Sequence, residues 1–150
     1  MAVGDIIKTE GLVIEEVTVK ANEDIEKGEF VVNDGNGFLA ATAALAALNQ
    51  PYVALEDHDY SEATNHKIRV GVKGVFEVQK KADTSGYAVV KGNKLTISST
   101  AGECQAFAAA DVTATVNETT VEAANLANLA AFGEAYADAA SAATSVKVRL

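Results

Sequence analysis

Short runs of β-branched and aromatic residues recur along this sequence, and turns that contain glycine or asparagine separate them. Branched and aromatic side chains favour strands, whereas glycine and asparagine tolerate the positive φ angles of tight turns. The Asp-Gly-Asn-Gly run at residues 34–37 is typical of a β-hairpin turn. The pattern predicts a mainly-β chain folded as a small barrel or sandwich with short helices. The expected strands are residues 11–20, 29–33, 38–40, 52–55, 67–72, 75–78, 86–90, 95–97 and 146–150.

The length of 150 residues is that of one domain, and no linker-like segment divides the chain. Two parts of it, about residues 12–80 and 81–150, share an order of features, which predicts two similar β units packed into one body. Chance similarity between simple β patterns is the alternative. The matched segments are residues 28–32 with 86–90, 54–57 with 135–138, and 61–69 with 141–149.

Alanine is concentrated in two segments, residues 40–47 and 123–143. The first could be a short helix or a loop, which Pro51 ends. A short helix is expected within 125–138. These small side chains could allow close packing against a partner, or the segments could be loops and weak helices. An Ala/Thr-rich stretch at residues 106–125 has only weak strand patterning.

The net charge and the lengths of the apolar runs argue against several classes of function. The formal net charge is −9. An acidic surface repels phosphate backbones, so direct nucleic-acid binding is not expected. No run approaches the roughly 20 apolar residues that cross a bilayer, and no secretory signal is visible, so we expect synthesis in the cytoplasm and no membrane partner.

The residues that could support chemistry do not form a recognisable pattern. Cys104 is the single cysteine and is expected to be a small, partly buried apolar residue. His58 lies among acids that could suggest a metal site, and His66 is the other histidine, but a solvated acidic loop explains this segment better. No phosphate-binding or nucleophile motif is present. We therefore predict no enzyme activity, no cofactor and no metal.

Several motifs in this order resemble the phage capsid cement proteins, also called decoration proteins, a family long catalogued as a domain of unknown function. The resemblance covers about residues 11–150 and is weakest at 106–125. The motifs are Gly-x-x-Val-Val at 28–32 and again at 86–90, Ala-Leu-Glu-Asp at 54–57, Val-x-Gly-Val-Phe-x-Val at 72–78, Lys80 or Lys81, Gly-x-Ala at 133–135, and Val-x-Val-x-Leu at 146–150.

The resemblance implies a small β-barrel-like or β-tulip-like domain over residues 12–150, with an extended N-terminal arm at 1–11. It implies a homotrimer on the exterior of the virion capsid, bound to the major capsid protein and to neighbouring decoration trimers, which stabilises the expanded head. The arm would contact the capsid or an adjacent trimer through Ile6, Ile7 and Lys8.

Alternative interpretations stay open from the residues alone. Val72, Val75, Phe76 and Val78 could form a trimer interface or fill the monomer core. The chain could also be a tail or head-fibre subunit of a virion, or a small ligand-binding barrel with a convergent pocket.

Overall fold

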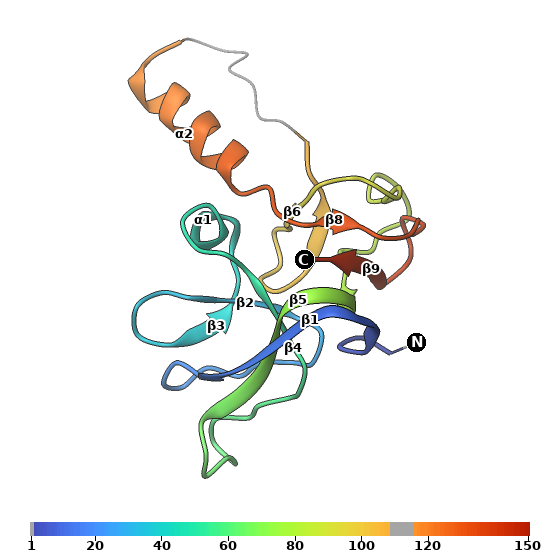
Figure 1. Cartoon of the computed structure of the whole chain (residues 1–150). Coiled ribbons are helices and arrows are strands. Elements are labelled where there is room, and N and C mark those ends of the chain that lie inside the picture. The colour runs from blue at the N-terminus through green and yellow to red at the C-terminus, as the bar shows by residue number, and fades with distance from the viewer. Residues whose placement is uncertain (1, 109–115) are drawn as a thin grey trace.

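The computed structural model describes residues 2–108 and 116–150 (Figure 1). Strands contain 39% of the residues and helices 11%, so the mainly-β prediction is confirmed. The strands are β1 (Ile6–Thr18), β2 (Phe30–Asn33), β3 (Phe38–Ala40), β4 (Tyr52–Ala54), β5 (Lys67–Gln79), β6 (Leu95–Ile97), β7 (Cys104–Ala106), β8 (Glu134–Ala135) and β9 (Ser145–Arg149). The helices are α1 (Ala43–Ala46) and α2 (Glu118–Leu129).

An antiparallel sheet organises the body of the protein. Within the described residues it has seven strands in the order β3-β2-β4-β5-β9-β8, and β1 pairs with β5 outside this path. The strands β6 and β7 form a separate pair. The expectation of a barrel is wrong, because the large sheet does not close. An isolated bridge between Val19 and Phe38 joins the end of β1 to β3, but it does not extend into a ladder.

The longest described strands, β1 and β5, differ from the sequence expectation. We expected a turn at Lys73 and Gly74, but β5 continues through both residues, with Gly74 at φ 138°. One side of β5 pairs with β1 in an antiparallel register that shifts near Gly74. Its other side pairs first with β4 and then with β9.

The segment expected to be an N-terminal arm is part of the sheet from Ile6 onward. Ile6 pairs with Phe76 and Lys8 pairs with Val75. The register then shifts before Val13 and becomes regular toward Thr18, so β1 contains a bulged segment around Gly11.

The core consists of two apolar clusters. The larger contains Phe30, Phe76, Val78 and Phe132, with side chains from both halves of the chain. The smaller is formed around Val31 and other residues of the first half. Val75, Phe76 and Val78 are buried, so they fill the monomer core, whereas Val72 is half-buried and packs against the smaller cluster.

Equivalent backbone contacts occur in the two halves of the chain. In each half, the glycine of a turn donates to an alanine carbonyl, and the preceding lysine amide donates to an aspartate carboxylate. These residues are Gly28, Ala54, Lys27 and Asp57 in the first half, and Gly92, Ala135, Lys91 and Asp138 in the second. Isolated bridges follow the same order, Ile25 with His58 and Val89 with Ala139.

These contacts match Gly28 with Gly92, whereas the sequence comparison had placed Gly86 opposite Gly28. The segment 86–90 correspondingly forms no strand; only Val89 makes a bridge. The strand β6 pairs with β7 instead. The match of residues 54–57 with 135–138 agrees with the shared contacts.

The first alanine-rich segment contains α1, whereas α2 begins at Glu118 and ends at Leu129, so it only partly overlaps the range 125–138 in which a helix was expected. Thr42 caps α1, since its hydroxyl accepts the amide of Leu45. Asn117 begins α2 with a capping box that includes Thr120. In Figure 1, α2 leads away from the sheet beyond α1, and none of its residues is buried. Of the expected Ala/Thr-rich stretch 106–125, residues 109–115 lie outside the described residues.

Candidate functional site

The residues predicted to make contacts lie on β1, at the margin of the sheet. Ile6 is 39% exposed, Ile7 is half-buried and Lys8 is exposed. Farther along the same strand, Val13 and Ile14 are 41% and 40% exposed. β1 therefore exposes Ile6, Val13 and Ile14 to solvent, although the chain buries many other valines and isoleucines completely.

Lys8 belongs to a group of cationic side chains around the ring of Tyr136. The Lys8 Nζ lies 5.3 Å from the ring centroid, the Lys91 Nζ 5.6 Å, and the Arg149 guanidinium carbon 5.1 Å. Arg149 also forms an ion pair with Glu134 at 2.7 Å. We call Lys8, Lys91, Arg149 and Tyr136 the cationic cluster.

Strand register and the turn contacts explain why these distant residues meet. Lys8 and Arg149 both pair with Val75, from the two sides of β5. Tyr136 directly follows β8, and its amide donates to the Lys147 carbonyl of β9. The turn that carries Lys91 is attached to this segment by the repeated contacts described above.

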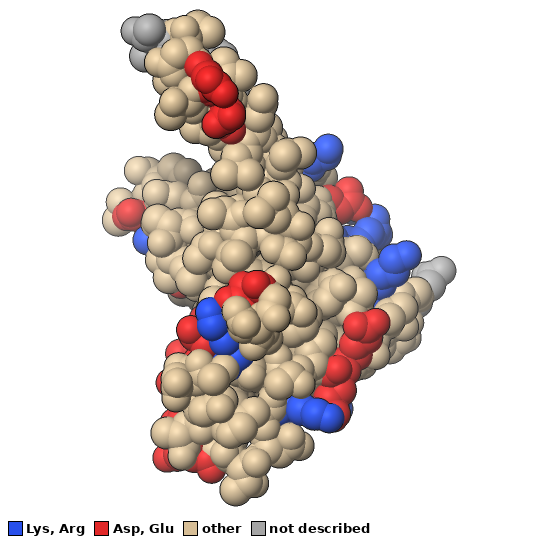
Figure 2. All heavy atoms as spheres, turned by 90° about the vertical axis from the view of Figure 1, so that its left-hand side faces the viewer, with Lys and Arg blue, Asp and Glu red and all other residues tan. Residues whose placement is uncertain are grey.

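The electrostatic effect of the cluster is visible at the phenol. The Lys8 ammonium, which hydrogen-bonds the phenol, lowers the pKa of Tyr136, and the charges of Lys91 and Arg149 act in the same direction. Cations near an aromatic face are attracted to its negative charge density. Three cations with Glu134 as a neighbouring acid give this region a local positive charge, in contrast to the net charge of the whole chain. In Figure 2, Lys and Arg side chains alternate with Asp and Glu side chains along the right-hand margin of the body.

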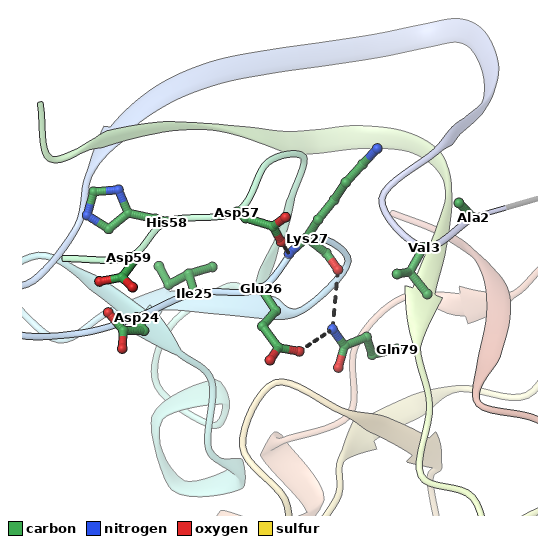
Figure 3. A pocket seen from close by; sticks show the side chains of 10 residues that line it. All are labelled: Ala2, Val3, Asp24, Ile25, Glu26, Lys27, Asp57, His58, Asp59 and Gln79. Atoms are coloured by element: carbon green, nitrogen blue, oxygen red, sulfur yellow. Dashed lines mark hydrogen bonds between the residues drawn. The ribbon is translucent and has the colours of Figure 1, made fainter. Parts of the chain in front are cut away.

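A shallow depression is lined by residues of three segments, 2–3, 24–27 and 57–59, together with Gln79, and Figure 3 shows their side chains. It has a volume of about 620 Å³, and its lining includes Asp24, Asp57, Asp59 and His58. Gln79 donates to the Glu26 carboxylate and to the Lys27 carbonyl across it, at 3.4 and 3.2 Å.

The acids of this depression stabilise loops and do not converge on a common point. Asp57 accepts the amide of Lys27, Asp24 accepts the amide of Tyr60, and Asp59 accepts both the amide and the hydroxyl of Ser61. Within residues 2–108 and 116–150, no group of three or more His, Cys, Asp or Glu side chains is arranged to hold a metal ion.

The two histidines and Tyr60 form a small aromatic group at the depression, in which the rings of His58 and His66 meet edge to face. His66 Nδ1 lies 3.3 Å from His58 Nε2, and the Tyr60 ring stacks on His66 with centroids 3.8 Å apart. His58 is buried. The sequence placed these residues in a solvated acidic loop, so the pairing of the two rings is a feature that it missed.

Two further reactive side chains are buried in structural roles. Burial raises the pKa of Cys104 to about 12, which disfavours the thiolate that would act as a nucleophile. The Lys80 Nζ, also buried, donates to the carbonyls of Lys81, Ser141 and Ala143 at 2.7, 3.1 and 3.2 Å. The three ammonium hydrogens thus match three carbonyl acceptors, and the bonds to Ser141 and Ala143 attach the 141–143 loop to the residue that follows β5.

The second element with exposed apolar residues is α2, which starts and ends earlier in the chain than the short helix expected within 125–138. Val121, Leu126 and Leu129 are 38%, 40% and 64% exposed, and Val116, just before the helix, is 72% exposed. No helix in the described part of the chain is long and apolar enough to cross a membrane. No known protein-family model matches the chain, and no curated protein sequence matches it.

Proposed function

We propose that this chain is a non-enzymatic structural protein of a tailed-virus head. In this proposal it binds the outside of the capsid as a homotrimer and stabilises the expanded shell, in contact with the major capsid protein and with neighbouring trimers. The resemblance of the motifs at residues 28–32, 54–57 and 72–78 to capsid cement proteins suggests this role.

The observation that carries the proposal is the apolar surface left uncovered on two separate elements, β1 and α2. Single exposed apolar residues are ordinary on protein surfaces, whereas several of them on one element suggest a surface that another protein covers. A net charge of −9 keeps such a chain soluble before it assembles. A β-sheet body with exposed apolar residues on β1 and α2 suits a role in binding protein surfaces.

Binding to heads tests the capsid role directly. The assay is cosedimentation of the purified chain with expanded, undecorated heads of the virus that encodes it. Deleting residues 1–11 is a poor variant, because it removes part of β1 from the sheet. Val13→Thr combined with Ile14→Thr is better, since threonine keeps the strand preference while it removes exposed apolar surface.

We expect the double variant to bind heads at least tenfold more weakly than the wild type. Leu48→Thr, which changes a side chain 74% exposed at the end of α1, is the matched control and should bind normally. If the wild-type chain does not bind heads, the capsid role is wrong. If it polymerises into tubes, a tail-subunit role replaces it.

A further inference from the structure

The helix α2 has a mixed surface that specifies the kind of partner it can accept. Glu118, Glu122, Asn125 and Leu129 are spaced four, three and four residues apart, so they lie on one face of the helix. Figure 2 shows acidic side chains along this projecting helix, and both glutamates are exposed. A surface that covers this face must therefore provide apolar contacts and positive charge together.

The chain itself has a surface with this combination. In the cationic cluster, Lys8 and Lys91 lie around the aromatic ring of Tyr136, and the exposed side chain of Ile6 lies two residues before Lys8 on β1. The long Lys and Arg side chains also offer apolar stems beside their charges. The acidic and apolar face of α2 and the cationic cluster are therefore complementary in charge and in composition.

We propose that α2 of one copy docks on the cationic cluster of the next copy. The contact joins two different surfaces, so it is head-to-tail, and repetition of such a contact closes a ring when the rotation between copies allows it. Packing of α2 against its own symmetry mates is disfavoured, because it would bring Glu118 and Glu122 of each copy together. The inference rests on the proposed homotrimer and assigns its interface.

Charge reversal on each surface tests the contact in the full-length chain. The first variant is Glu118→Lys with Glu122→Lys, and the second is Lys8→Glu with Lys91→Glu. The four side chains are exposed, so the substitutions leave the core unchanged, and circular dichroism checks the fold. Analytical ultracentrifugation over a range of concentrations measures the mass of each protein.

The wild type is expected at three times the chain mass of 15.5 kDa. Either double variant should raise the concentration at which the oligomer dissociates by at least tenfold. All four substitutions in one chain should restore most of the association, because the charges are exchanged across the contact. Glu23→Lys with Glu62→Lys makes the same charge change elsewhere on the surface and should leave the mass unchanged.

Three results would overturn the inference. The wild type could stay monomeric, or the reversal of the α2 charges could leave association unchanged. The variant with all four substitutions could also fail to regain association. Loss of oligomers in the control variant as well would assign the effect to net charge and also overturn it. Head binding by a monomeric wild type would retain the capsid role and remove this interface. A trimer that shows the expected charge dependence but does not bind heads would retain this interface and remove the capsid role.

Discussion

Replacement of Lys80 by methionine should destabilise the fold strongly, although methionine has a similar length and is apolar. The variant Lys80→Met removes the ammonium that binds the carbonyls of Lys81, Ser141 and Ala143. The Ser141 carbonyl also accepts the amide of Asp83 at 3.1 Å and keeps that partner. The other two carbonyls lose a charge-assisted hydrogen bond.

A buried acceptor that loses its partner costs about 1–3 kcal/mol. Two such losses, reduced by the relief of no longer burying a charge, give an expected destabilisation of about 3 kcal/mol. For a chain of this size each kcal/mol lowers Tm by roughly 2–4 °C, so the melting temperature should fall by roughly 6–12 °C. Lys81→Met changes the neighbouring, partly exposed lysine and should cost less than about 0.5 kcal/mol.

Urea unfolding followed by far-ultraviolet circular dichroism measures these differences, since the chain contains no tryptophan. Amide hydrogen exchange adds a local test. The amides of Lys80 and Asp83, which donate to Thr144 and Ser141, should exchange faster in Lys80→Met. A Lys80→Met protein within about 1 kcal/mol of the wild type would refute the role assigned to the ammonium.

Three further outcomes follow from titratable groups. The hydrogen bond from Lys20 lowers the pKa of Asp34, so ionised Asp34 stabilises the fold above its unfolded pKa, and this contribution is lost as pH falls through the folded pKa. Asp34→Asn should therefore lower the urea midpoint at pH 7 but not at pH 2; an equal difference at both would contradict this. The thiol of Cys104 should resist alkylation at pH 8 until urea unfolds the chain, and rapid labelling of the native protein would show that it is accessible. Lys8→Met should raise the pKa of Tyr136 toward its usual value in an NMR titration, and an unchanged pKa would mean that Lys8 does not act on the phenol.

Local residue chemistry was sufficient to predict the elements whose structure depends on near neighbours. The turn at residues 34–37 joins β2 and β3 in antiparallel pairing, as its glycines and asparagine indicated. Local residue chemistry was insufficient to predict β5, because Gly74 has the positive φ of a turn residue yet lies within the strand. The Gly74 backbone exchanges hydrogen bonds with Leu150 at the far end of the chain, a contact that the residues around Gly74 do not reveal.

The candidate site was predictable only in part, for the same reason. Ile6 and Lys8 were singled out from the sequence, but as members of a separate arm and not of a sheet. The cationic cluster depends on the register of β1 and β9 against β5, and the spacing of lysines along the chain contains no signal for it. The mixed face of α2, with Glu118, Glu122 and Asn125 beside Leu129, lacks the apolar periodicity that would have indicated a helix.

The position of Phe76 on β5 has a consequence for cooperativity. This residue pairs with Ile6 of β1 on one side and Val148 of β9 on the other, so strands from the two ends of the chain meet on one central strand. Detaching either end would uncover the same buried ring. The two similar halves should therefore not melt one after the other, as stacked repeats can, and thermal unfolding should be a single two-state transition whose calorimetric and van't Hoff enthalpies agree.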